Sequence, residues 1–268
     1  MTTPIETVPS LAEEVAAAIK ELYAKVQNLV TEDDEPVDNL YSEKQQRLLT
    51  EPLYSSWAGP EPEVEGGQRR PFLVSANVGL FFSINEPPLV PDVFLSLDVT
   101  IPEDWHEKHR RTYFFWEFGK PPDVVIEVVS NQKGNELGSK RLSYARIGIP
   151  YYIVYDPARQ LSEQVLHIFQ RNGTEYVART DPYFKAVGLG VTLWEGVFEG
   201  VRDTWLRWCD SRGEVIPTGA ERAQREAERA QREAERAQRE AERAQREAER
   251  ADRLAAKLRE LGIDPDTI

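Results

Sequence analysis

Three side chains in this 268-residue chain have the chemistry of a hydrolytic metal site: Asp92, Glu127 and Lys140. Glu127 stands inside the apolar run VVIEVVS at residues 124–130, where an ionised carboxylate is costly unless it is paired, hydrogen-bonded or bound to a metal. Asp92 starts the preceding long apolar segment and can reach Glu127 if the two segments form neighbouring strands. Lys140 lies on the helix expected after the Glu127 strand and is the obvious cation to pair with Glu127. Tyr144 lies one helical turn further on the same face.

These residue types point to phosphodiester hydrolysis that depends on a divalent cation. Two carboxylates supply hard oxygen ligands of the kind that Mg²⁺ prefers, and Mg²⁺ keeps several of its waters in such sites. The metal polarises the phosphate and lowers the pKa of a bound water. A lysine ammonium stabilises the charge that develops on the phosphorus centre, or orients the attacking hydroxide. We therefore expect Asp92 and Glu127 to bind Mg²⁺, and Lys140 to act with them as a catalytic residue.

Each of the three residues also has an ordinary structural interpretation. Asp92 follows a proline and has the position of a turn residue at the entry to a strand. Glu127 can be a structural acid that pairs with Arg141 or Arg146 on the next helix. A lysine on a helix is usually solvated, so a role for Lys140 depends on the two acids.

The segments around these residues predict a mixed α/β core with a strong β component. Short apolar or alternating runs mark the strands, and apolar residues at helical spacing mark the helices. An Asn-Gly pair at residues 172–173 predicts a hairpin turn. The expected strands are residues 72–84 with a break at Asn77 or Gly79, 93–99, 124–130, 151–155, 164–170, 174–179 and 188–193, and the expected helices are residues 11–29, 42–49, 136–147 and 201–208.

The C-terminal part follows a different pattern, the heptad Glu-Arg-Ala-Gln-Arg-Glu-Ala, which repeats four times from Glu221 to Ala248. Its alanines alternate spacings of four and three residues, as in the seam of a coiled coil. Acids four residues before an arginine, as in Glu221 and Arg225, support the helix. We expect a coiled-coil helix over residues 221–262, capped by Gly262, that binds a second copy or a protein partner. The alternative is a solvated single helix held by its own ion pairs.

The charge of the chain is unevenly distributed. There are 33 Lys and Arg against 46 Asp and Glu, a net charge of -13. Residues 220–253 hold ten Arg, nine Glu and one Asp and are neutral, so almost all of the excess acid belongs to residues 1–219. An acidic surface opposes binding to phosphates. Contacts with nucleic acid must therefore be local, along Arg69 and Arg70 or residues 108–111, and sensitive to salt.

Composition also excludes several classes of protein. A single cysteine, Cys209, excludes a disulfide framework and a Cys-rich zinc site. No segment approaches the ~20 consecutive apolar residues of a membrane span. The first 19 residues lack the positive charge and apolar run of a signal peptide. We expect a cytoplasmic protein without a membrane partner.

The stretches VPDVFLSLDV and GKPPDVVIEVVSNQKGNELGSKRLSYARIGIPYYIVYDP resemble the PD-(D/E)xK nuclease superfamily and, more closely, its Uma-type restriction-endonuclease-like family. The resemblance covers about residues 40–212. It implies a restriction-endonuclease-like α/β core, with a mixed central sheet flanked by helices, and a Mg²⁺-dependent endonuclease that cleaves DNA. By this resemblance Asp92 is the PD aspartate and Glu127 the second acid.

The sequence departs from the superfamily at one position, because Val129 stands where the motif has lysine. The resemblance implies that the lysine comes from the following helix, as Lys140, with Lys133 as a weaker candidate. The expected division is an N-terminal helix and linker (1–36), the restriction-endonuclease-like domain (37–212), a hinge (213–220), the heptad helix (221–262) and a tail (263–268). The competing interpretation is a catalytically silent scaffold or regulatory protein that binds partners through the heptad helix.

Overall fold

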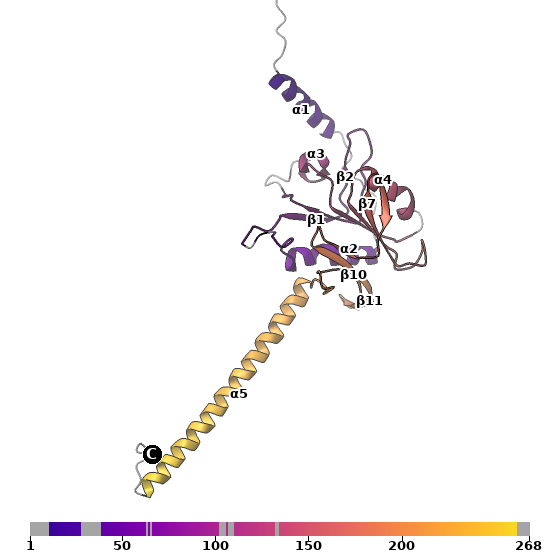
Figure 1. The fold of residues 1–268 in the computed structure, drawn as a ribbon. Helices are drawn as coiled ribbons and strands as arrows, with labels where there is room; N and C mark the ends of the chain where they lie inside the picture. Colours follow the sequence, from indigo (N-terminus) through magenta and orange to yellow (C-terminus); the bar gives the residue numbers. More distant parts are fainter. Residues whose placement is uncertain are drawn as a thin grey trace, which may run out of the picture. The chain divides into compact units, whose positions relative to one another are not determined.

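The computed structural model describes residues 11–27, 39–62, 64, 66–101, 106, 110–131 and 134–261. The chain forms two compact units, Met1–Ile216 and Pro217–Ile268, which are called the body and the arm below (Figure 1). No helix among the described residues combines the length and the apolar character needed to cross a membrane.

A mixed six-stranded sheet forms the centre of the body. Its order is β1-β3-β5-β6-β7-β8, with β5 and β6 parallel and every other neighbouring pair antiparallel. The chain leaves β5 and returns to β6 through a helical crossover, as parallel neighbours require. The mixed sheet with flanking helices confirms the predicted fold class. The strands are β1 (Phe72–Ala76), β3 (Val93–Leu97), β5 (Val124–Val128), β6 (Tyr151–Tyr155), β7 (Leu166–Asn172) and β8 (Glu175–Ala178).

Helices in the body are α1 (Leu11–Gln27), α2 (Leu40–Ser56), α3 (Phe115–Phe118) and α4 (Arg141–Arg146), with a π-helical turn, η2 (Glu136–Lys140), directly before α4. The prediction placed a short helix at residues 42–49, but α2 runs for 17 residues. Asn39 caps it by accepting hydrogen bonds from two backbone N–H groups of the first turn, and Pro52 lies inside it. Burial of Leu49 and Leu53 against the sheet outweighs the poor helix propensity of the second half.

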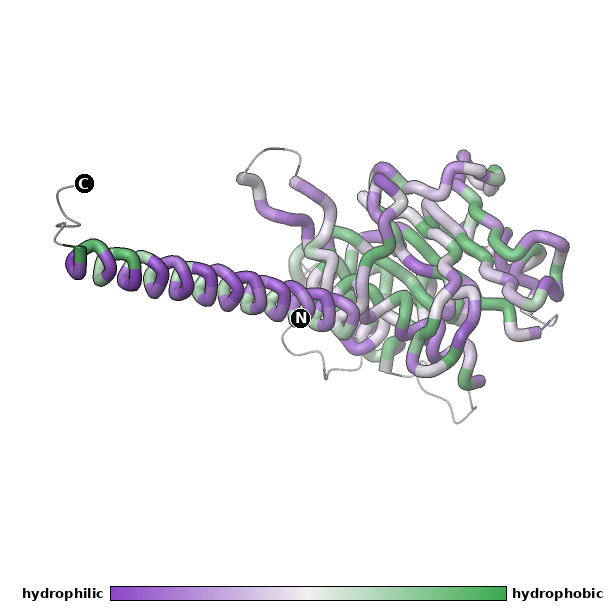
Figure 2. Tube along the Cα trace, turned by 90° about the horizontal axis from the view of Figure 1, so that it is seen from below, coloured by the Kyte–Doolittle hydropathy of each residue, from purple (hydrophilic) through white to green (hydrophobic). Residues whose placement is uncertain are grey.

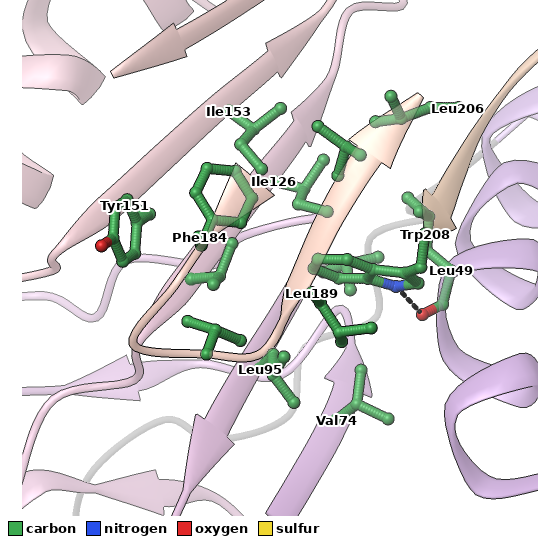
Figure 3. Packing of buried hydrophobic residues seen from close by; sticks show 14 of the residues in the cluster. Leu49, Val74, Leu95, Ile126, Tyr151, Ile153, Phe184, Leu189, Leu206 and Trp208 are labelled. Carbon is green, nitrogen blue, oxygen red and sulfur yellow. Dashed lines mark hydrogen bonds between the residues drawn. The ribbon is translucent and has the colours of Figure 1, made fainter. Parts of the chain in front are cut away.

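The two faces of the central sheet carry separate hydrophobic clusters, because side chains alternate along each strand. One face holds Leu95, Ile126 and Ile153 and packs against α2 and a second, three-stranded sheet (Figure 3). The second sheet contains β9 (Tyr183–Phe184), β10 (Leu189–Phe198) and β11 (Val201–Cys209). The Trp208 indole N–H donates to the backbone oxygen of Leu49 at 2.7 Å and so ties this sheet to α2. The opposite face carries Phe94, Val125 and Tyr152 and also receives Glu127.

The predicted helix at residues 201–208 is wrong, because this segment is the strand β11. Val201, Trp205 and Trp208 fit helical spacing, which misled the prediction. The segment instead pairs with β10 over its whole length, and it places Trp205 opposite Trp194. Glu199 and Gly200, both with positive φ, form the tight turn that joins the two strands. Cross-strand packing of aromatic residues outweighs the local periodicity here.

Smaller differences concern the ends of elements. The strand predicted at 72–84 divides into β1 and β2 (Leu80–Phe81), and the break falls at Asn77, which has a φ of 55°. β2 pairs in parallel with β4 (Tyr113–Phe114). In the β7–β8 hairpin, Asn172 pairs with Glu175, so the turn is Gly173-Thr174, one residue later than predicted. The predicted end of the first helix at Leu29 lies outside the described residues.

The arm is one helix, α5 (Gly219–Glu260), of 42 residues (Figure 2). Thr218 and Glu221 form a capping box at its start. None of its residues is buried, and Leu254 is 65% exposed. Four of the ion pairs along it place arginine before glutamate, and two have the predicted acid-first order: Arg222–Glu226, Arg229–Glu233, Arg236–Glu240 and Arg243–Glu247, then Glu235–Arg239 and Glu242–Arg246. The predicted cap at Gly262 lies outside the described residues.

Candidate active site

Glu127 lies in the middle of the central sheet, on strand β5 between β3 and β6. Its side chain is 2% exposed and sits among the apolar residues of the sheet face that carries Val125 and Tyr152. A buried carboxylate at this depth requires hydrogen-bond donors or a cation.

Lys140 and Tyr144 supply those partners from the crossover between β5 and β6. The Lys140 ammonium lies 3.0 Å from Oε2 of Glu127, and the Tyr144 hydroxyl donates to Oε1 at 2.7 Å. Lys140 ends the π-helical turn η2 and Tyr144 lies one turn later in α4, so both side chains face the sheet. The side chain of Lys140 is 32% exposed. The lysine side chain is therefore partly exposed, whereas the Glu127 side chain is buried.

The alternative partners of Glu127 are engaged elsewhere. The Arg141 guanidinium lies over the ring of Phe169, 5.3 Å from its centroid. Arg146 forms an ion pair with Glu86. Lys133, the weaker lysine candidate, lies outside the described residues.

Asp92 lies beside Glu127, at the start of the neighbouring strand β3. Its Oδ2 accepts a hydrogen bond at 2.6 Å from the backbone N–H of Val128, the residue that follows Glu127. Its Oδ1 accepts a hydrogen bond at 3.2 Å from the side-chain amide of Gln46. The antiparallel pairing of Val93 with Ile126 fixes this placement. The structure thus brings together the three residues that the sequence singled out.

Gln46 and Asn77 complete this arrangement, and sequence reasoning missed both. Gln46, on α2, is 4% exposed and exchanges two side-chain hydrogen bonds with Asn77, at 3.1 and 3.0 Å. The backbone N–H of Asn77 donates to the backbone oxygen of Asp92 at 3.2 Å. A signal was available, since Gln46 shares a helical stripe with Leu49 and Leu53, which predicts burial. Gln46 thus holds the Asp92 carboxylate, and Asn77 holds Gln46 and the Asp92 backbone.

Among the described residues, burial and the charges of Glu127, Asp92 and Lys140 dominate the electrostatics of the site. Burial raises the pKa of Glu127 to about 8, and the negative charge of Asp92 adds to this rise, whereas Lys140 and Tyr144 oppose it. Burial lowers the pKa of Lys140, but Glu127, Glu136 and Asp92 together raise it above its usual value. Lys140 and Tyr144 therefore offset only part of the cost of burying the charged form of Glu127.

The donor set suits a hard cation of the Mg²⁺ type. Asp92 and Glu127 offer carboxylate oxygens, and Mg²⁺ is commonly held by one or two carboxylates while it keeps several waters. The described residues contain no group of three or more His, Cys, Asp and Glu side chains placed to share a metal ion. This argues against a site fully enclosed by protein ligands, such as structural zinc requires.

Residues 36–184 match the model of the Uma2 family, which is described as "Putative restriction endonuclease". The match covers more than half of the chain. The chain belongs to the Uma2 family. No curated protein matches it.

The Uma2 match contains α2, the strands β1 to β8 and the crossover, and hence all of the residues described around Asp92 and Glu127. The hairpin β10–β11 and the arm lie beyond it. The predicted resemblance to a Uma-type restriction-endonuclease-like family is therefore confirmed.

Two basic segments were predicted to contact nucleic acid. Arg69 pairs with Glu61, and Arg70 pairs with Asp98, so both are occupied within the body. Of residues 108–111, only Arg110 and Arg111 are described. They line a pocket of about 180 Å³, whose other walls include Leu73, Phe94 and Tyr113.

The raised pKa of Glu127 predicts how stability changes with pH in the metal-free protein. The folded state keeps the Glu127 proton up to about pH 8, whereas the unfolded chain releases it near 4.5. The stabilisation is therefore complete below pH 4.5 and is lost as pH rises to about 8, by up to about 1.4 kcal/mol per pH unit. Glu127→Gln does not titrate there, so the wild type should lose stability relative to this variant across the window.

Urea unfolding in the presence of a chelator, from pH 4 to 9, measures this difference. Glu163→Gln is the matched control, because Glu163 is exposed, and it should follow the wild type at every pH. A wild type that gains stability over Glu127→Gln as pH rises would contradict the prediction, since it would mean that Glu127 is held as an anion.

A second prediction contrasts two neighbouring glutamines. The sequence predicts that Asp92 binds Mg²⁺ for phosphodiester cleavage. On that expectation Gln46→Leu, which removes a hydrogen bond to the Asp92 carboxylate, should weaken cleavage roughly 10- to 100-fold, as outer-shell changes in metal sites do. Gln45 is equally buried but bonds to the backbone of Leu206, so Gln45→Leu should cost stability, about 1–3 kcal/mol, without this effect. The Mg²⁺ concentration for half-maximal cleavage, measured beside urea unfolding, separates the two. Equal metal dependence in both variants would contradict a role for Gln46.

Proposed function

We propose that the protein is a Mg²⁺-dependent endonuclease that hydrolyses DNA phosphodiester bonds. The observation that supports this most strongly is the Lys140–Glu127 ion pair next to Asp92 in a chain of the Uma2 family. The family supports nuclease chemistry in general, and the two acids with one lysine supply the groups that such chemistry uses.

In this proposal Asp92 and Glu127 hold the metal and Lys140 is a catalytic residue. Mg²⁺ bound there would polarise the phosphate and lower the pKa of its bound water. The ammonium of Lys140, whose side chain is partly exposed, stabilises the negative charge that builds up on the phosphate oxygens. Tyr144 holds Glu127 in place through its hydroxyl, and the Val128 N–H does the same for Asp92.

Binding of DNA must overcome the acidity of the body. Residues 1–219 hold 21 Lys and Arg against 33 Asp and Glu. We infer that DNA contacts concentrate at few positions, among which Arg110 and Arg111 are candidates because they line a pocket beside Phe94. Phe94 pairs with Val125 on the sheet face of Glu127, so this pocket lies on that face. The resulting binding would weaken strongly as salt rises.

Substitution of the three residues tests the proposed activity. Asp92→Asn, Glu127→Gln and Lys140→Ala should each lower Mg²⁺-dependent cleavage of plasmid DNA by roughly 100-fold or more, because each removes a charge from the reacting centre. Cleavage is measured at several Mg²⁺ concentrations with DNA and RNA, single- and double-stranded. Circular dichroism checks that each variant is folded.

Two lysine variants complete that experiment. Lys185→Ala is the matched control, because Lys185 is exposed and should be dispensable. Lys133→Ala tests the other lysine that the family resemblance leaves open. Full activity of Asp92→Asn or Glu127→Gln would refute the proposed site. It would favour the alternative, a nuclease fold that serves as a scaffold.

The exposed arm is the observation that favours a partner. We propose that α5 associates through its alanine seam with a second copy of the chain, since identical seams are complementary to each other. Ala230→Lys with Ala237→Lys, both on the seam, should then lower the molar mass in solution to that of a monomer. Gln231→Lys with Gln238→Lys, both off the seam, should leave it unchanged.

Light scattering after size-exclusion chromatography measures this mass. The chain without residues 217–268 should be monomeric as well. An unchanged mass after this truncation would argue against self-association through the arm and leave a different protein partner as the interpretation.

A further inference from the structure

Glu136 is a buried acid that the proposed chemistry does not use. It is 5% exposed, and its Oε2 is one of the few buried side-chain atoms among the described residues that have no hydrogen-bond partner. A buried carboxylate oxygen without a donor costs free energy, so the fold must retain it for a reason. Its other oxygen, Oε1, lies 3.8 Å from the Lys140 ammonium.

Lys140 therefore stands between two buried carboxylates. It hydrogen-bonds to Glu127 at 3.0 Å, whereas the 3.8 Å to Glu136 is about 1 Å longer than a charge-assisted hydrogen bond. The 32% exposure of the lysine side chain leaves it room to turn. Glu136 and Lys140 begin and end the turn η2, which is kinked at Gly138, whose φ of -107° and ψ of -111° are not helical.

A metal on Glu127 changes the balance between these two partners. In the proposed function Mg²⁺ takes oxygens of Glu127, and an ammonium bound to the same carboxylate is then repelled by the metal. Glu136 is the other described carboxylate that forms an ion pair with Lys140, through Oε1 at 3.8 Å, and its Oε2 has no hydrogen-bond partner. We propose that Glu136 is a positioning residue that takes over the Lys140 ammonium when a divalent cation occupies Glu127, and so keeps this charge at the reacting phosphate. This inference rests on the proposed metal site.

A different role for Glu136, as a third metal ligand, fits the geometry less well. The Lys140 ammonium contacts both Glu127 and Glu136, and the described residues contain no three-acid group placed to share a metal. The two roles differ in their effect on metal affinity, because removal of a ligand weakens metal binding and removal of a lysine anchor does not.

A crystal structure of the full chain with Mg²⁺ gives the direct test. We expect the Lys140 nitrogen within about 3 Å of a Glu136 oxygen and displaced from Glu127. A Mg²⁺-bound structure in which Lys140 keeps its contact with Glu127 and remains distant from Glu136 would overturn the inference.

Variants provide a second readout, by calorimetric titration with Mg²⁺ and by steady-state cleavage. Glu136→Gln should leave the Kd for Mg²⁺ within about twofold and the KM for DNA unchanged, but lower kcat roughly tenfold or more. Glu136→Asp, which keeps the charge, should recover part of kcat. Glu163→Gln, an exposed acid, should match the wild type in all three quantities. Loss of Mg²⁺ affinity in Glu136→Gln would make Glu136 a ligand, and behaviour like Glu163→Gln would make it irrelevant; either overturns the proposal.

Failure of this inference can be told apart from failure of the nuclease proposal. A wild type that binds Mg²⁺ and moves Lys140 to Glu136, but cleaves no nucleic acid, refutes the nuclease and supports the inference. A wild type that cleaves DNA while Lys140 stays on Glu127 refutes the inference alone. A wild type that binds no Mg²⁺ refutes both.

Discussion

A carboxylate buried in the middle of a β-sheet has to be compensated by the groups packed around it, and Glu127 imposes this constraint on the body. The ammonium of Lys140 and the hydroxyl of Tyr144 converge on a side chain that is 2% exposed. The crossover between β5 and β6 must bring its first turns over this position, and the turn that does so, η2, is kinked at Gly138. The arrangement keeps an ionisable group where an apolar residue would have packed more favourably, as is common at functional sites.

Sequence reasoning found the centre of this site because its anomaly is local. An acid inside an apolar strand is visible without any structure, and a lysine with a tyrosine one turn later marks the helix face that covers it. Gln46 was missed because its bond to Asp92 depends on where α2 docks, and Asn77 because its bond to Asp92 depends on the pairing of β1 with β3. Glu136 was missed for a similar reason, since it is an ordinary helix residue until burial leaves one of its oxygens without a donor.

The fold was predicted best where a single period was unambiguous. The six strands of the central sheet and the heptad helix follow from short apolar runs and a repeat of seven. β11 was wrongly predicted as a helix, because the tryptophans at positions 205 and 208 fit a helical period. The segment is a strand because it pairs with β10. Where aromatic residues are spaced irregularly, strand pairing in the folded protein determines the secondary structure and the local pattern does not. The sequence of α5 does not identify the partner of the arm, because alanine side chains bury little surface and so give little specificity.

The parallel pairing of β5 with β6 also has a consequence for how the protein matures. Asp92, Glu127 and Lys140 come from three separate stretches of chain, and β5 is held between β3, which precedes it, and β6, which follows the crossover. During synthesis, a chain that does not yet include Tyr151–Tyr155 lacks β6, one of the two strands that flank Glu127. Contacts of this sequence separation form late and slowly. The two acids and the lysine therefore come together only when the sheet is completely folded. An incomplete chain contains these residues but does not form the site.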